Sequence, residues 1–215
     1  MIEQYKRIII ATSNENKKRE IRYILEQYKN IRILDLPNNI TKKFNIDETG
    51  TTFVENAIIK AKGLAKLLNN CLELKNEDVY ILSDDSGIEI DALNGEPGVL
   101  SGRYGHFDNP DNLNKVEKLL KKMNCIKNRK ATFTGVIAIL HKKTNKLQTY
   151  VGIINGIISE QKARGITGFD YDILFIPEGY KKTLSELSIE TKNSISHRYN
   201  GIKKAIFDIN NNYFE

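Results

Sequence analysis

The sequence predicts an α/β protein whose β-sheet is mixed. A buried strand over residues 6–12 is followed by a helix over 14–28, and strands continue to alternate with helices along the first half of the chain. Two long strands, 130–142 and 146–159, then follow one another through a short turn. Strands that alternate with helices favour parallel pairing, and two strands joined by a short turn favour antiparallel pairing. We therefore expect both kinds of pairing in one sheet.

The first strand and helix follow from hydrophobic spacing. Residues 6–12, KRIIIAT, contain a short apolar run, which indicates a buried strand. In residues 14–28 the apolar side chains recur at the spacing of one helical face, at Ile21, Ile24, Leu25 and Tyr28. A second strand, IRILDL, covers residues 31–36, and the polar residues 37–50 predict a loop.

The next predicted helix covers residues 51–70. Its apolar side chains form one stripe, at Phe53, Ala57, Ala61, Leu64 and Leu68. A threonine is available to cap its N-terminus, and Glu55 lies in the first turn, where a negative charge suits the helix dipole.

The remaining elements follow from alternation and turn residues. Residues 81–93 begin with an apolar run, and apolar and polar residues then alternate over 88–92, which predicts a strand and a hairpin-like return. A loop rich in Gly and Pro leads to an amphipathic helix that begins near Pro110. After the long hairpin we expect a short strand over 173–177 and a helical region that ends near Asn212.

Length and composition narrow the class of protein. The chain has 215 residues, 40% of them hydrophobic, which is enough to bury a substantial core in one compact unit. No apolar run has the length of a secretory signal or a membrane span, so we expect a cytoplasmic protein with no membrane partner. The distant Cys71 and Cys125 indicate reduced thiols rather than a disulfide framework or a zinc site.

The net charge of +6 and the pI of about 9.1 raise the question of a nucleic-acid partner, because basic residues neutralise phosphates. Acidic residues are interspersed among the basic ones, as in KKREIRYILEQYK, and the bases fall on the polar faces of predicted helices. A basic balance also suits a small polyphosphate substrate. We therefore expect no stable nucleic-acid partner.

The segment TSNENK, residues 12–17, joins the first strand to the first helix. A helix N-terminus attracts phosphate through unpaired backbone N–H groups and its dipole, and Lys17 adds a full charge. The alternative is an ordinary cap, in which Thr12, Ser13 or Asn14 satisfies the first turn and Lys17 is solvated. Because the GxxxxGK[ST] phosphate loop is missing, the segment alone favours the cap.

The segment SDDSG, residues 83–87, places two aspartates side by side. Neighbouring side chains of a strand point to opposite faces, so Asp84 and Asp85 share one site only if the strand ends there. The following Ser-Gly pair predicts such a turn. One carboxylate then binds a hard cation such as Mg²⁺, with Glu48 available as a second acid. The alternative is an Asx-turn with solvated charges.

Two later segments carry groups suited to a nucleotide. TKNSISHR, residues 191–198, contains Lys192, His197 and Arg198, a set that reads phosphate or a purine edge. GFDYD, residues 168–172, offers aromatic side chains for stacking and carboxylates for the N–H groups of a base. The alternatives are a structural histidine and aromatic side chains packed in the core.

Taken in order, six segments closely resemble the motifs of the inosine triphosphate pyrophosphatase family. They are IIIATSNENKKRE, DETGTTFVENAIIKAK, SDDSG, EPGVLSGRY, GFDYD and KNSISHR, from about Ile8 to Arg198. The resemblance implies an α/β fold with a mixed, twisted sheet and two lobes around a central cleft, formed by residues 1–215 as a single domain. It also implies a homodimer that uses Mg²⁺ to hydrolyse ITP, dITP or XTP to the monophosphate and pyrophosphate.

The resemblance further implies roles for individual residues. Asp85 would be the general base and, with Glu48, a metal ligand, while Asp84 and Lys17 would complete the catalytic set. The triphosphate would be held by Thr12, Ser13, Asn14, Glu15, Asn16, Lys17 and Lys60. The nucleoside and its base would be contacted by Ser86, Phe169, Asp170, Tyr171, Asp172, Lys192, His197 and Arg198.

The chain departs from the family pattern at several positions. Ser13 stands where glycine is usual, and Gly102 where alanine is commoner. ITGFDYDI, residues 166–173, stands where the family has TGGFGYDP, so Asp170 adds a negative charge beside the implied base pocket. This difference leaves open a related pyrophosphatase of pyrimidine or modified triphosphates. The basic balance leaves open a nucleotide- or RNA-binding protein that does not hydrolyse its ligand.

Overall fold

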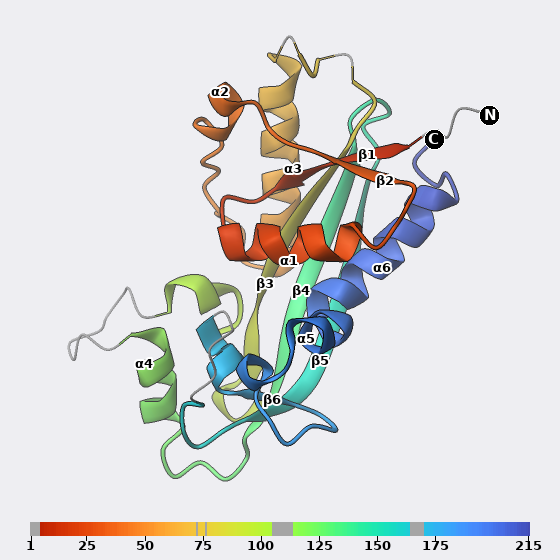
Figure 1. Cartoon of the computed structure of the whole chain (residues 1–215). Coiled ribbons are helices and arrows are strands. Elements are labelled where there is room, and N and C mark those ends of the chain that lie inside the picture. Colours follow the sequence, from red (N-terminus) through yellow and green to blue (C-terminus); the bar gives the residue numbers. More distant parts are fainter. Residues whose placement is uncertain (1–4, 72, 76, 105–113, 164–169) are drawn as a thin grey trace. The chain divides into compact units, whose positions relative to one another are not determined.

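The computed structural model describes residues 5–71, 73–75, 77–104, 114–163 and 170–215. These residues form a six-stranded sheet of order β2-β1-β3-β4-β5-β6 (Figure 1). The strands are β1 (Lys6–Ala11), β2 (Ile31–Leu34), β3 (Tyr80–Ile90), β4 (Lys130–His141), β5 (Leu147–Ile158) and β6 (Phe175–Pro177). β1 pairs in parallel with β2 and β3, whereas β5 and β6 are antiparallel, which confirms the predicted mixed sheet.

Except for α2, the α-helices lie close to the predicted positions. They are α1 (Glu15–Leu25), α2 (Asn38–Thr41), α3 (Phe53–Asn69), α4 (Lys115–Lys122), α5 (Ile189–Ile195) and α6 (His197–Asn210). Short 3₁₀ helices are η1 (Asp91–Leu93), η2 (Gly98–Arg103), η3 (Asp170–Ile173) and η4 (Leu184–Glu186). The described part of the fourth helix begins after the cap Asn114, and Pro110 lies outside the described residues.

Two local features follow from backbone hydrogen bonding. The predicted loop over 37–50 contains α2, a single turn that is too short to show helical periodicity and that buries Ile40. The predicted cap of α3 is confirmed. The Thr52 hydroxyl accepts from the Glu55 N–H and the Glu55 carboxylate accepts from the Thr52 N–H, each at 3.1 Å, which forms a capping box.

The chain divides into two compact units. Unit 1 contains Met1–Asp85, Gly135–Gly152 and Arg198–Glu215, and unit 2 contains Ser86–Thr134 and Ile153–His197. Because β3, β4 and β5 each contribute residues to both units, neither unit is one continuous stretch of chain.

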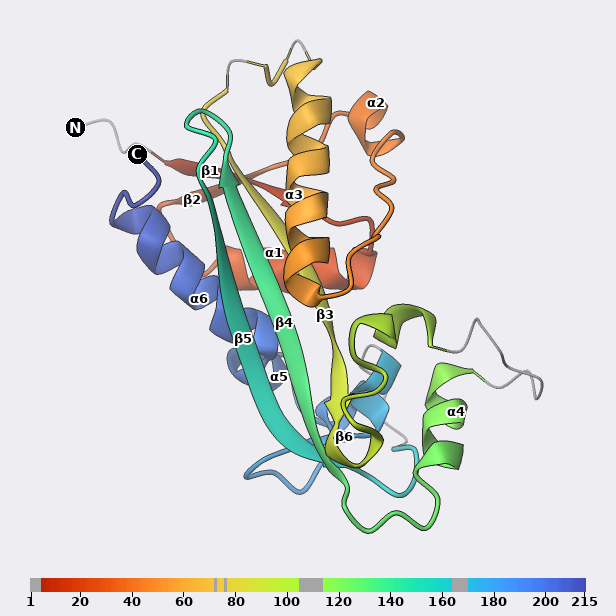
Figure 2. The same cartoon turned by 180° about the vertical axis from the view of Figure 1, so that it is seen from behind.

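Unit 1 covers both faces of its part of the sheet. α1 and α6 lie on one face and α3 on the other, as Figures 1 and 2 show from opposite sides. On the first face, Ile21 and Ile24 of α1 and Ile206 of α6 pack in the same core as Leu82 of β3. The five apolar residues of the predicted α3 stripe are all buried. Strands covered on both faces need apolar residues at consecutive positions, which explains the buried run in the last four residues of β1.

Unit 2 has its own core. Ile88 and Ile90 of β3, Leu119 of α4 and Phe175 of β6 are fully buried in it. β5 approaches β6 closely at Gly156, where a Cβ atom would overlap the Ile176 carbonyl oxygen and lie 2.7 Å from the Phe175 ring. Only glycine therefore allows this spacing between the two strands.

No helix within the described ranges has the length and apolar character needed to cross a membrane. Cys71 is buried and Cys125 is exposed, and both are free thiols.

We expect Gly156→Ala to lower the free energy of unfolding by about 1–3 kcal/mol, because the added methyl group overpacks the contact with β6. Gly102→Ala is the matched control, since a Cβ atom at Gly102 would meet nothing within 4 Å. The control should stay within about 0.5 kcal/mol of wild type. Urea unfolding followed by circular dichroism measures both, and equal midpoints for the two variants would contradict the close approach.

Candidate active site

The adjacent aspartates lie within an unbroken strand. The predicted turn at Ser86 and Gly87 is wrong, because β3 continues from Tyr80 to Ile90. Gly87 is required for a different reason. A Cβ atom there would overlap the Gly98 carbonyl oxygen and lie 2.9 Å from the Ser101 Cβ atom, so the glycine allows η2 to pack against the strand. Ser86 is half-buried.

Strand alternation sends Asp84 to the face covered by α1 and α6. Its carboxylate is fully buried and lies 2.8 Å from the Lys17 ammonium of α1. The Arg198 guanidinium of α6 lies 3.5 Å from the same oxygen. Two cations from two helices thus offset the cost of burying this charge.

Asp85 points to the opposite face, which α3 covers. One oxygen of its carboxylate lies 3.1 Å from the Lys60 ammonium, and the other accepts from the Asn56 side-chain amide at 3.2 Å. Asn56 and Lys60 are four residues apart and therefore lie on one side of α3. The two neighbouring aspartates are consequently not equivalent, because they have different partners on different faces.

Glu48 joins the Asp85 side of the site. Its carboxylate lies 3.1 Å from the Lys60 ammonium, so two carboxylates share one cation. The Glu48 side chain is 41% exposed, whereas those of Lys60 and Asp85 are each 8% exposed. Solvent therefore reaches this group of charges from the Glu48 side.

Sequence reasoning assigned no role to two residues of this site. Asn56 accepts from the Gly50 N–H at 2.8 Å while it donates to Asp85, so it connects Asp85 to the loop that carries Glu48. Glu20 accepts from Arg198 at 2.9 Å. Two features of the sequence could have identified these residues. Asn56 is a polar residue one turn before Lys60 on the buried side of α3, and Glu20 is an acid three residues after Lys17 in α1.

Burial raises the pKa of the Asp85 carboxyl above its ordinary value. The positive charges of Lys60 and Lys17 oppose this shift in pKa, and the negative charges of Glu48 and Asp84 add to it. A carboxyl group with a raised pKa accepts a proton more readily, which suits a general base.

The N-terminus of α1 has features of both interpretations of residues 12–17, the phosphate-binding turn and the ordinary helix cap. The Asn14 side chain caps the helix by accepting from the N–H groups of Asn16 and Lys17 at 3.0 and 3.1 Å, and Thr12 accepts from the Asn14 N–H at 3.2 Å. The side chain of Lys17, however, is not solvated as in an ordinary cap, because it binds Asp84. Three residues of the segment are exposed, namely Ser13, Glu15 and Asn16.

Unit 2 contains the remaining described candidates. Lys192 of α5 lies 2.6 Å from Asp172 of η3, and both side chains are mostly buried. The Tyr171 side chain is 2% exposed within the core, and its hydroxyl donates to the Ser101 carbonyl at 3.2 Å. The buried His197 ring stacks on Phe133 with 5.2 Å between ring centroids. Phe169 lies outside the described residues, as does the side chain of Asp170.

The Glu48 and Asp85 pair is chemically suited to a hard divalent cation. In the part of the chain that the structure describes, no group of three or more His, Cys, Asp or Glu side chains is arranged to hold a metal ion. Mg²⁺ does not require such a group, because one or two carboxylates hold it together with substrate phosphates. Two carboxylates that converge on one ammonium nitrogen fit this donor set.

Comparisons with known proteins identify a family to which nearly the whole chain is similar. The model of the Ham1 family matches residues 8–207. The dITP/XTP pyrophosphatase of Campylobacter concisus (strain 13826) is 40% identical over 212 residues, covering 94% of this chain and 95% of that protein. That of Bacillus anthracis is 37% identical over 202 residues, covering 93% of this chain and 94% of that protein. The Staphylococcus aureus Ham1 protein structure has a TM-score of 0.77 at 34% identity, covering 96% of this chain and all of that one.

We expect Asp85→Asn to unfold at a higher temperature than wild type at pH 7 in EDTA. The pKa of Asp85 is higher in the folded state than in the unfolded state, so protonation of this carboxyl group stabilises the folded protein. This stabilisation is present below the unfolded pKa and is lost as pH rises through the folded pKa. The neutral amide avoids this loss, and Lys60 keeps Glu48 as a partner. Thermal unfolding between pH 4 and 8 should show a difference that widens with pH, to about 0.5–2 kcal/mol.

Asp84→Asn is the matched control on the other face of β3. This substitution removes the buried carboxylate that pairs with the Lys17 ammonium, which lowers the free energy of unfolding by about 3–5 kcal/mol. Equal destabilisation by the two substitutions would contradict the different roles assigned to the neighbouring aspartates.

Proposed function

Because the chain belongs to the Ham1 family, we propose that it hydrolyses the deaminated purine triphosphates dITP, XTP and ITP to the monophosphate and pyrophosphate with the help of Mg²⁺. The observation that carries this proposal is the group of Glu48, Lys60 and Asp85, which combines two carboxylates suited to a metal with a buried ammonium. The relatives named dITP/XTP pyrophosphatase support the choice of substrate.

The reaction breaks one phosphoanhydride bond. The oxygen of a water molecule bonds to the α-phosphorus, the bond from that phosphorus to the bridging oxygen breaks, and the bridging oxygen leaves with pyrophosphate. We assign the proton of the attacking water to Asp85, whose raised pKa suits this transfer. Asn56 holds the second Asp85 oxygen, so the carboxylate has a fixed orientation.

Glu48 and Asp85 are the proposed metal ligands. Bound Mg²⁺ would neutralise negative charge on the phosphate oxygens as the bond breaks. Asp84 faces away from Asp85 and supports the site through Lys17 and Arg198.

The triphosphate is proposed to bind at the N-terminus of α1, where the helix dipole favours an anion and Ser13, Glu15 and Asn16 are exposed. Lys17 and Lys60 then supply positive charge to the phosphates and to the leaving pyrophosphate. The segment from Thr12 to Asn16 contributes backbone and side-chain contacts in this proposal.

We propose that Ser86 contacts the nucleoside. The Lys192 and Asp172 pair places a donor beside an acceptor, which suits the oxo and N–H groups of a deaminated purine. The roles that the family resemblance implies are retained for Phe169, Asp170, Tyr171, His197 and Arg198. A related pyrophosphatase of other bases remains the second candidate, because ITGFDYDI differs from the family pattern.

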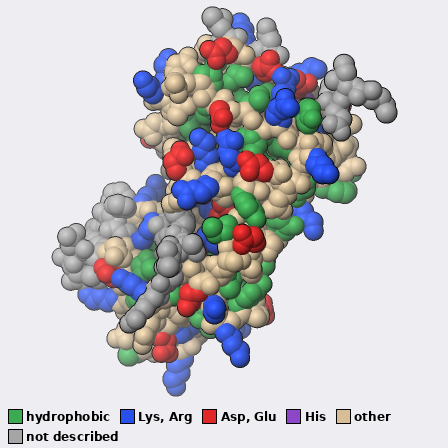
Figure 3. Space-filling model, in the orientation of Figure 1, with side chains coloured by type: hydrophobic (Ala, Val, Ile, Leu, Met, Phe, Trp, Pro, Cys, Tyr) green, Lys and Arg blue, Asp and Glu red, His purple; other side chains and the backbone are tan. Residues whose placement is uncertain are grey.

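The surface gives little support to an RNA-binding role. Figure 3 shows Lys and Arg side chains interspersed with Asp and Glu on the visible face rather than gathered into one basic patch. Buried carboxylates in the site also weaken binding of a polyanion in the absence of a metal. A location in the cytoplasm, where nucleotide pools are used, completes the proposal.

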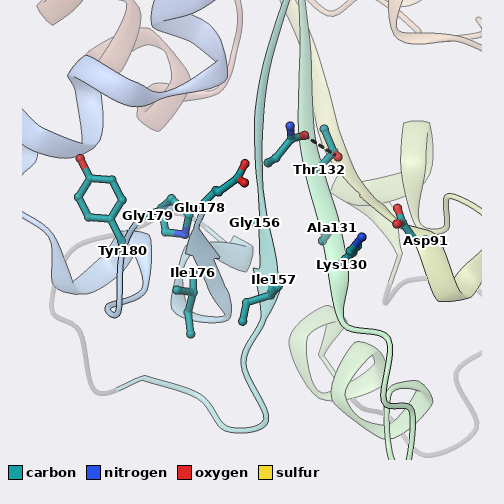
Figure 4. A pocket seen from close by; sticks show the side chains of 12 residues that line it. Asp91, Lys130, Ala131, Thr132, Gly156, Ile157, Ile176, Glu178, Gly179 and Tyr180 are labelled. Atoms are coloured by element: carbon teal, nitrogen blue, oxygen red, sulfur yellow. Dashed lines mark hydrogen bonds between the residues drawn. The ribbon is translucent and has the colours of Figure 1, made fainter.

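We also propose a homodimer formed through an open sheet face of unit 2. A cavity of about 530 Å³ lies over β5 and its neighbours (Figure 4). Ile153 and Ile157 of β5 are 48% and 46% exposed, and exposed apolar patches of this kind mark interaction surfaces. Lys130 lies on the β4 side of β5, and Glu178 follows β6 on the other side (Figure 4). A two-fold axis over β5 therefore pairs each lysine with the glutamate of the second copy.

We expect the purified protein with Mg²⁺ at alkaline pH to release pyrophosphate from dITP, XTP and ITP faster than from ATP, GTP, CTP or UTP. Asp85→Asn should lower kcat by about 10²–10⁴-fold, the usual contribution of a general base. Lys127→Gln, an exposed change outside the proposed site, is the control. Initial rates with identification of the phosphate product measure this, and orthophosphate as the only product would rule out the proposed reaction.

We expect Lys130→Glu to convert the dimer to monomers, because like charges then meet at the interface. The double variant Lys130→Glu, Glu178→Lys should restore the dimer, and Lys127→Glu should leave it unchanged. Sedimentation velocity measures the three species. The proposed interface would be wrong if the wild-type protein is a monomer or if the Lys130→Glu variant is still a dimer.

A further inference from the structure

The Lys60 ammonium occupies the position between the two proposed metal ligands. It lies 3.1 Å from the Glu48 carboxylate and 3.1 Å from the Asp85 carboxylate. Its side chain is only 8% exposed. Lys60 is therefore the cation that balances these two acids in the protein without nucleotide.

The Asp85 carboxylate is positioned by contacts that do not involve Lys60. Asn56 donates to the second oxygen of Asp85 and accepts from the Gly50 N–H, in the same loop as Glu48. Asp85 is also fixed by its place within the continuous strand β3. Asp85 therefore keeps its position, and the loop that carries Glu48 stays attached to α3, if the ammonium moves away.

A divalent cation and the ammonium cannot occupy this position together. A metal bound to Glu48 and Asp85 would take the same oxygens that Lys60 now contacts, at shorter distances. Two cations on one pair of oxygens repel each other strongly in a buried site. Lysine, in contrast, has a flexible four-carbon stem and can move its charge to another partner.

We propose that Lys60 is a built-in counter-ion that holds the place of the metal and leaves it when the metal binds. The ammonium released in this way becomes available to the phosphates of the substrate. This inference rests on the proposed function for the identity of the metal ligands. It adds that metal and triphosphate favour each other's binding, because the metal frees the charge that the phosphates require.

The first test measures the affinity for Mg²⁺ alone. Protein freed of metal with EDTA is titrated with MgCl₂ by calorimetry in the absence of nucleotide. We expect K60Q to bind Mg²⁺ at least about fivefold more tightly than wild type, because the competing cation is gone. K17Q is the matched control, since Lys17 pairs with Asp84 on the other face, and its gain should be smaller.

Two further variants test whether the gain in Mg²⁺ affinity arises at the Glu48 and Asp85 carboxylates and whether Lys60 has only a structural role. Adding Glu48→Gln to K60Q should remove the gain, because the metal then loses one ligand. If Lys60 instead supports the carboxylates mechanically, K60Q will bind Mg²⁺ equally well or more weakly, and the proposal is overturned. K60M, with an apolar stem of similar length, gives the same comparison if K60Q does not fold.

A second test uses the wild-type protein. Cyanate modifies accessible amines, and mass spectrometry reports the modified fraction of each lysine. We expect Mg²⁺ to increase modification of Lys60, and an unchanged or reduced level would contradict its displacement. Both tests omit nucleotide, so their failure is distinguishable from a failure of the proposed hydrolysis, which the substrate panel measures.

Discussion

The burial of two neighbouring carboxylates in one continuous strand is the constraint on which the site depends. Asp84 and Asp85 are both nearly inaccessible, and strand geometry directs them to opposite faces. Neither charge is tolerable without a partner, so each face of the sheet must be covered by a helix that brings a cation. Lys17 and Lys60 meet this requirement from α1 and α3.

The two faces solve the same electrostatic problem differently. On the Asp84 side, Glu20 binds Arg198 and two cations approach one buried acid, which gives a closed set of charges. On the Asp85 side, two acids compete for one ammonium, and one of them is accessible to solvent. The first arrangement is suited to holding elements together, and the second to exchanging partners.

Much of the fold was predictable because hydrophobic spacing reports burial. The run at β1 and the stripe on α3 identified their elements, and the threonine cap of α3 was readable from local chemistry. The continuation of β3 through Ser86 and Gly87 was not predictable, because these residues are typical of a turn and the reason for the glycine lies in its packing against η2, a separate element of the chain. Distant contacts of this kind leave no local pattern.

The candidate site was predictable only in part for a similar reason. Local motifs indicated the acids and Lys17, and the family resemblance added Lys60. Neither indicated which lysine binds which acid, since that depends on the face that each helix covers. Asn56 carried no motif of its own, and its role became visible only through its bonds to Gly50 and Asp85.

Arg198 and Asp84 are far apart in the sequence, and this separation affects the order in which unit 1 folds during synthesis. Unit 1 is assembled from three separated stretches of chain, and the last of them begins with Arg198, which contacts Asp84. During synthesis the first stretch, with Lys17 and Asp84, leaves the ribosome long before α6 exists. The face of the sheet that α6 covers cannot be completed before α6 exists, so unit 1 finishes folding only after residues 198–215 have been translated.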